Sequence, residues 1–117
     1  MWGTLGRSAF ARELQVSELG GELLAARAAT LDARVAFYSV NFGEASRHLE
    51  DARDLLRRAG ERLKNLSRAD EIRQLDTAVA GIDDARRLAG KLDQNANSRA
   101  GEAAKILSDV LATATPW

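Results

Sequence analysis

Proline, the residue that most reliably interrupts a helix, occurs once in this chain, at position 116. Nothing before that position forces a helix to break, because every other residue type carries the backbone N–H that the helix requires. Alanine and leucine, two strong helix formers, occur along the whole chain. The 117 residues are enough for one domain. The sequence therefore predicts an all-α fold: a single antiparallel bundle of three or four long helices with short connections.

Apolar residues recur at spacings of three and four residues over 8–40, 42–64 and 68–113, which predicts a helix in each range. Gly20 and Gly21 interrupt the first range, so either the helix bends there or another backbone packs close to it. The inward face of the second helix is predicted as Ala45, Leu49, Ala52, Leu55 or Leu56, Ala59 and Leu63. That of the first is assigned to Val16, Leu19, Leu23, Leu24, Ala28, Leu31, Val35 and Tyr38, with Leu23-Leu24 as a doublet.

The range 68–113 allows two interpretations. Its apolar stripe keeps its phase from Ile72 to Val110, which favours one continuous helix, but residues 93–98 are rich in turn formers. A turn near 95–98 would create a fourth helix over 98–113. A continuous helix would leave apolar overhangs that a two-fold homodimer could cover, whereas a fourth helix would fold back over the first and make a monomer sufficient.

Residues with capping preferences mark the helix ends. Asn41 followed by Glu44 predicts a reciprocal N-cap for the second helix, and Ser67 followed by Asp70 predicts one for the third. Ser8 is the expected N-cap of the first helix, and Asn65 the expected C-terminal cap of the second.

The segment Asn41-Phe42-Gly43-Glu44-Ala45, followed by Leu49 and Ala52, resembles the turn and second helix of a tetratricopeptide (TPR) hairpin. The resemblance covers about 12 residues and implies an antiparallel helical hairpin. The family's aromatic and Leu-Gly positions are occupied by Ala29, Asp32 and Ala33, and its closing proline by Arg57. No 34-residue period is visible, so no peptide-binding residues are transferred.

The composition argues against several chemistries. The chain has no cysteine and one histidine, His48, which excludes disulfides, thiol catalysis, zinc fingers and most histidine-rich metal sites. The formal net charge is zero, and the arginines between positions 53 and 62 alternate with acidic residues, so nucleic-acid binding is not expected. We expect no cofactor, no metal and no membrane insertion, because the longest uncharged stretch, 35–43, is far shorter than the about 20 residues of a membrane span.

The remaining polar patterns are typical of a solvated helix surface. Asp54 precedes Arg57 and Arg58, and Asp83 precedes Arg86 and Arg87, at spacings that form ion pairs within one helix. No Ser-His-acid or phosphate-binding motif is present, so the chain is not expected to be an enzyme.

The predicted function is a non-catalytic protein–protein interaction or scaffold module that binds itself as a homodimer or binds another protein. This prediction rests on the expectation that the helices carry more apolar surface than a monomer can cover. The candidate interaction patch is Phe37, Tyr38, Phe42, Leu92, Leu107 and Leu111. The alternative is a binding protein for a small apolar ligand held between helices near the three aromatic residues.

Overall fold

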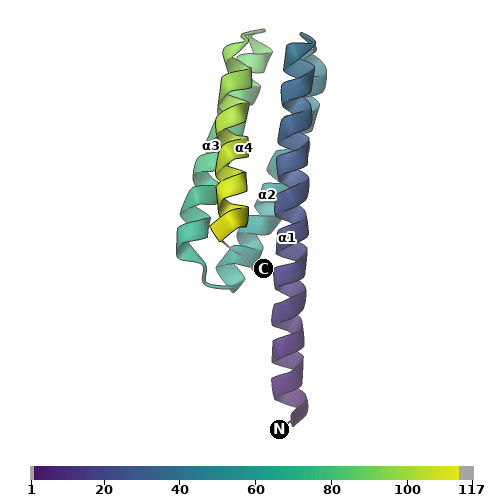
Figure 1. The fold of residues 1–117 in the computed structure, drawn as a ribbon, viewed down its shortest axis with the longest axis vertical. Coiled ribbons are helices and arrows are strands. Elements are labelled where there is room, and N and C mark those ends of the chain that lie inside the picture. The colour runs from purple at the N-terminus through teal and green to yellow at the C-terminus, as the bar shows by residue number, and fades with distance from the viewer. Residues whose placement is uncertain (1, 114–117) are drawn as a thin grey trace.

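The computed structural model describes the backbone of residues 2–113 and the side chains of residues 9–112. It contains four helices: α1 (Trp2–Tyr38), α2 (Phe42–Asn65), α3 (Ala69–Gly90) and α4 (Asn95–Thr113). Each helix packs antiparallel against its neighbour in sequence, and α4 returns to lie against α1 (Figure 1). This closed up-down-up-down arrangement confirms the predicted all-α bundle.

Small side chains build much of the core. The α2 face is confirmed as predicted, with Leu56 fully buried and Leu55 only partly so. Between α3 and α4 the contact is especially close, because a Cβ added to Gly81 would lie 3.5 Å from the Ala103 Cβ. On these two helices the other buried small residues are Ala78, Ala85, Ala89, Ala96, Ala100, Ala103 and Ala104. The alanines therefore allow the helix axes to approach one another, as a thin bundle requires.

The chain turns between α3 and α4, so the continuous-helix interpretation is wrong. The turn occupies residues 91–94, slightly earlier than the predicted 95–98, and α4 begins at Asn95. Two of its polar side chains form hydrogen bonds: Asp93 Oδ1 accepts the Asn95 N–H at 2.9 Å, and the Gln94 amide donates to the Phe37 carbonyl at 2.9 Å. Arg34 Nε donates to Asn97 Oδ1 at 2.7 Å. The bonds of Gln94 and Asn97 attach the turn and the start of α4 to the end of α1, and they favour the turn over a straight helix.

Helix α1 is longer than predicted and unbroken. It starts at Trp2, so Ser8 lies inside the helix and is not its N-cap. Gly20 and Gly21 are both helical, and a Cβ added to Gly21 would meet nothing within 4 Å. Neither of the two predicted alternatives applies at Gly21, because the helix does not break and no neighbouring backbone packs against this glycine. By the α-helical rise, α1 measures ~55 Å against ~36 Å for α2, and its N-terminal part projects beyond the other three helices (Figure 1).

The three turns share one backbone geometry. Val40, Ser67 and Leu92 adopt left-handed conformations, with φ of 56° to 57°. In each case the next residue's N–H donates to a carbonyl five residues back, for example from Asn41 to Ala36 at 2.8 Å. This is the Schellman arrangement, which usually has glycine at the left-handed position. Asn65 accordingly lies one residue before the C-cap of α2, which is Leu66.

Only one of the two predicted N-caps of the interior turns forms. Asn41 Oδ1 accepts the Glu44 N–H at 3.1 Å, and its amide donates to the Glu44 carboxylate at 2.9 Å. The cap position of α3 is Arg68, without a side-chain cap bond, because Ser67 is in the left-handed conformation of the preceding turn.

We therefore expect Asn41→Ala to lower the free energy of unfolding by about 1 kcal/mol, the usual cost of losing an N-cap. Ser67→Ala is the matched control, and it should change stability by less than half as much because no cap bond is lost. Chemical denaturation of both variants measures the difference. Equal losses in the two would show that the turns are wrongly placed.

Ion pairs connect the helices at the surface. Arg53 pairs with Asp83 at 2.7 Å and Arg86 with Glu50 at 2.8 Å, both between α2 and α3. Asp84 accepts bonds from Arg87 of its own helix at 2.7 Å and from Arg99 of α4 at 2.8 Å, and these two bonds hold its pKa below the ordinary value. The predicted pairing of Asp83 within its own helix is thus replaced by a bond across helices.

Candidate interaction surface

A second apolar stripe runs along α1, on the side facing away from the bundle. Its members alternate at spacings of four and three residues, all of them are exposed, and none carries a charge. We call it the outer stripe: Phe10, Leu14, Ser17, Gly21, Leu24, Ala28, Leu31, Val35 and Tyr38. Alternating spacings of three and four are typical of a helix that packs against another helix along its length.

The inner face of the same helix has the same spacing but is shifted in phase. Its residues are buried in the core: Leu19, Leu23, Ala26, Thr30, Ala33 and Phe37. Thr30, the buried polar residue among them, donates its hydroxyl to the Ala26 carbonyl at 2.8 Å. Helix α1 therefore has two faces with the same spacing of apolar residues, and the bundle covers only one of them.

Large exposed apolar side chains concentrate on the outer stripe. Of the eight found in residues 9–112, six belong to it: Phe10, Leu14, Leu24, Leu31, Val35 and Tyr38. The other two, Val40 and Leu92, lie in the two turns at the opposite end of the bundle from the chain's N-terminus (Figure 1). Scattered exposed leucines are ordinary, but a continuous apolar row is typical of an interaction surface.

The predicted inward face of α1 combines residues from both faces of the helix. Its first three positions, Val16, Leu19 and Leu23, face the bundle, whereas the remaining five from Leu24 onward are exposed or belong to the outer stripe. The change occurs at the doublet Leu23-Leu24, because Leu23 lies on the inner face and Leu24 on the outer stripe. That doublet, together with the unbroken spacing from Phe10 to Tyr38, was the signal that could have separated the two faces.

Charged residues border the outer stripe along both edges. On the edge towards α4, Arg27 Nε donates to Ser108 Oγ at 2.7 Å, and Arg34 is held by Asn97. On the edge towards α2, Glu18 pairs with Arg62, which also pairs with Glu22 at 2.9 Å. By the seven-residue repeat, Glu13 shares the first edge and Asp32 the second. An apolar row with charged borders is the pattern of a coiled-coil seam.

The bundle covers only part of α1 lengthwise. Arg62, near the end of α2, reaches back as far as Gln15, to which it donates at 3.2 Å. Helix α4 ends at Thr113, five residues beyond Ser108, and so comes level with about residue 22 of α1. Leu19 and Leu23 are buried, as expected if a fourth helix folds back. Helix α2 ends at Asn65, three residues beyond Arg62, so Leu14 lies near the end of α2 and Phe10 projects beyond both neighbours.

The candidate patch from the sequence is divided between core and surface. Phe37 and Leu107 are fully buried, and Phe42 packs edge-on against Phe37 with ring centroids 5.9 Å apart. Leu111 is partly buried against the core. Tyr38 and Leu92 are 73% and 70% exposed. Only Tyr38 lies on the outer stripe, so the structure does not bring these six residues together.

The polar residues considered for chemistry do not gather into a catalytic or metal-binding cluster within the described residues. His48 Nε2 is 3.7 Å from the Glu44 carboxylate one turn away on the exposed side of α2. Within the described part of the chain, no three His, Cys, Asp or Glu side chains are arranged to hold a metal ion. No helix over residues 2–113 is both long and apolar enough to cross a membrane.

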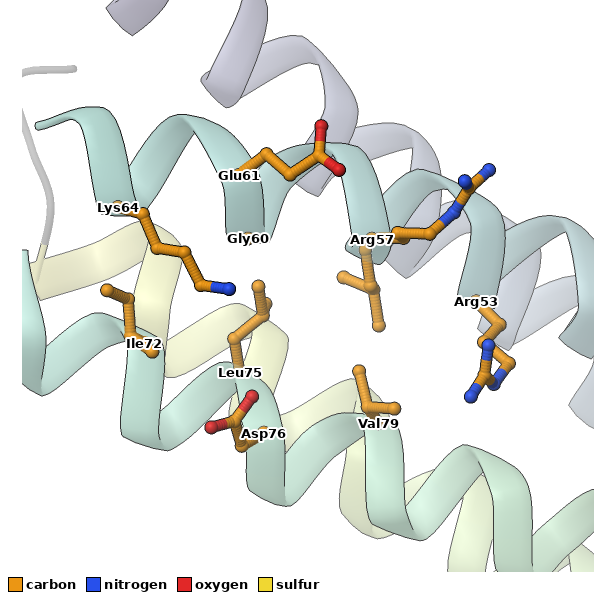
Figure 2. Close-up of a pocket in the computed structure, with 10 residues that line it drawn as sticks. Arg53, Arg57, Gly60, Glu61, Lys64, Ile72, Leu75, Asp76 and Val79 are labelled. Atoms are coloured by element: carbon orange, nitrogen blue, oxygen red, sulfur yellow. The ribbon is translucent and has the colours of Figure 1, made fainter.

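A groove separates α2 from α3 and has a volume of about 320 Å³. Ile72, Leu75 and Val79 of α3 face Gly60 across it, and Arg53, Glu61, Lys64 and Asp76 form a charged rim (Figure 2). The missing side chain at Gly60 leaves room there, since a Cβ would lie 3.6 Å from a Leu75 methyl group. The groove lies at a different pair of helices from the aromatic residues considered for ligand binding.

Comparisons of the chain with protein-family models, curated proteins and solved structures find no match. The resemblance of residues 41–52 to a TPR hairpin therefore stays a prediction.

Proposed function

We propose that this chain is a non-catalytic helical interaction module that associates with itself through the outer stripe of α1. The observation that carries the proposal is the row of nine exposed, uncharged positions spaced as a helix-packing face. The continuous-helix argument for a homodimer no longer applies, because α4 folds back. The outer stripe supplies a different reason, which does not depend on that turn.

The energetics of burial favour a protein partner. Covering one exposed leucine is worth about 2 kcal/mol, and Leu24 alone is 56% exposed in the isolated chain. The stripe extends over about eight turns of helix, which matches a second helix rather than a small molecule. The non-catalytic part of the proposal rests on the single histidine and the absence of cysteine.

The test is the molar mass in solution of the unmodified chain and of two variants that place the same charge at different leucines. We expect the unmodified chain to be a dimer by light scattering at tens of micromolar. Leu24→Asp should be monomeric with its helicity retained, because a carboxylate in the seam would be buried without a partner. Leu92→Asp, at an exposed leucine outside the stripe, should remain a dimer.

Three results would contradict this function. One is an unmodified chain that is monomeric at millimolar concentration. Another is a dimer that Leu24→Asp leaves intact. The third is a dimer that only Leu92→Asp dissociates, which would move the interface to the turns.

The second candidate function is binding of a small apolar ligand, and the groove between α2 and α3 is the observation that favours it (Figure 2). Filling the groove with Gly60→Leu should abolish binding of an apolar fluorescent probe while leaving the molar mass unchanged. Probe binding that survives this substitution would exclude the groove as the site.

A further inference from the structure

We infer that the occupant of the outer stripe is a second copy of the same α1 helix, running antiparallel in one particular register. This inference rests on the proposed function and adds the orientation and the pairing of residues. The seam it predicts has four layers, each formed twice around a two-fold axis: Phe10 with the partner's Val35, Leu14 with the partner's Leu31, Ser17 with the partner's Ala28, and Gly21 with the partner's Leu24.

The side-chain sizes fit this register. Near the axis, Gly21 lies opposite the partner's Leu24, so that each leucine fills the space left by a glycine. The next layer joins two small residues, and the outer two layers join large apolar ones. The middle parts of the two α1 helices can therefore approach closely, while the ends of the stripe bury the most apolar area. This also explains Gly21, a helix-interior glycine that has open space beside it in the isolated chain.

The charges on the edges select the orientation. In an antiparallel pair each edge of the seam lies against the same edge of the partner. On the edge towards α4, Glu13 then falls nearest the partner's Arg34, with opposite charges, and Arg27 nearest the partner's Gly20. On the edge towards α2, Glu18 falls nearest the partner's Ala25. The register thus contains two attractive pairs and no pair of like charges.

The alternative arrangements bring like charges together. A shift of one heptad towards the C-terminus sets Arg27 against the partner's Arg27, and Glu18 against the partner's Asp32. A shift the other way sets Glu18 against the partner's Glu18, although it also sets Glu13 against the partner's Arg27. In a parallel pair the two edges face each other. Arg27 then meets the partner's Asp32, but Glu13 meets the partner's Glu18, so the attractive and the like-charge pairs are equal in number. Each like-charge pair across a seam disfavours its arrangement.

The projecting end of α1 has a role in this arrangement. Phe10 lies beyond its own bundle and Leu14 lies near the bundle's end, and in the antiparallel pair they cover the partner's Val35 and Leu31. Each chain thus uses its projecting segment to cover the C-terminal half of the partner's stripe. In a parallel pair the projecting segments would pack only on each other, and they would not cover the C-terminal half of the partner's stripe.

Disulfide cross-linking tests the register, and the absence of cysteine makes each introduced thiol the only one. Leu14→Cys and Leu31→Cys are prepared separately, mixed in equal amounts and oxidised under native conditions. We expect a covalent dimer in the mixture, consisting of one chain of each variant. Neither variant alone should cross-link, because two copies of position 14 would be about 25 Å apart along the seam.

Leu14→Cys mixed with Tyr38→Cys is the matched control for register, since it would cross-link only after a shift of one heptad, about 10 Å. Cross-linking in that mixture, or of Leu14→Cys with itself, would overturn the register while light scattering still shows a dimer. A chain that is monomeric by light scattering would overturn the proposed function together with this inference.

Discussion

Leu107→Asp is expected to leave the chain unfolded at 25 °C. Leu107 is fully buried in the face of α4 that packs into the core. Removing a buried leucine side chain costs about 2–5 kcal/mol, and burying an unpaired carboxylate adds a further penalty. A domain of this size has a total stability of about 5–15 kcal/mol. The combined loss therefore consumes most or all of it. Far-ultraviolet circular dichroism measures the loss of helix directly.

Leu92→Asp is the matched control for this experiment, because it introduces the same charge at a leucine that is 70% exposed. Aspartate also tolerates the left-handed conformation at Leu92 better than leucine does. We expect the helical signal of this variant to be unchanged and its melting temperature to be equal or higher. If Leu107→Asp stayed folded, or if both variants unfolded alike, the placement of α4 would be wrong.

Phe37→Ala should lower the free energy of unfolding by about 3–5 kcal/mol, the range for truncating a buried phenylalanine. Phe37 is fully buried, packs against Phe42 and closes the end of the core where α1 meets α2. The neighbouring Tyr38 is 73% exposed, so Tyr38→Ala should change stability by only about 0.5 kcal/mol, as surface substitutions do. Urea denaturation at equal protein concentration compares the two variants.

The two aromatic variants also separate folding from association. Tyr38 lies at the end of the outer stripe, beyond the four predicted layers, so its removal should weaken the dimer only slightly. A large loss of stability in Tyr38→Ala, with little loss in Phe37→Ala, would mean that the end of α1 is rotated from the position described here.

Features that depend on a few neighbouring residues could be predicted from the sequence. The cap at Asn41 forms because its side chain reaches the N–H of Glu44, three residues away. The buried face of α2 follows from its apolar spacing, since that helix has one apolar side and charged residues elsewhere. Local geometry is sufficient in such cases, and the all-α fold follows from the same kind of signal.

Where the local sequence allows two structures equally well, contacts between helices select one of them. The α3 stripe keeps its phase through residues 91–94, so only contacts from the turn to α1, such as Gln94 with the Phe37 carbonyl, distinguish a turn from a helix. On α1, both apolar faces satisfy the helical period. Which of them is buried depends on the partners that α2 and α4 offer, for example Ser108 for Arg27, 81 residues away in the chain. The spacing of apolar residues identifies an apolar face of a helix, but only the packing of the other helices determines what covers that face.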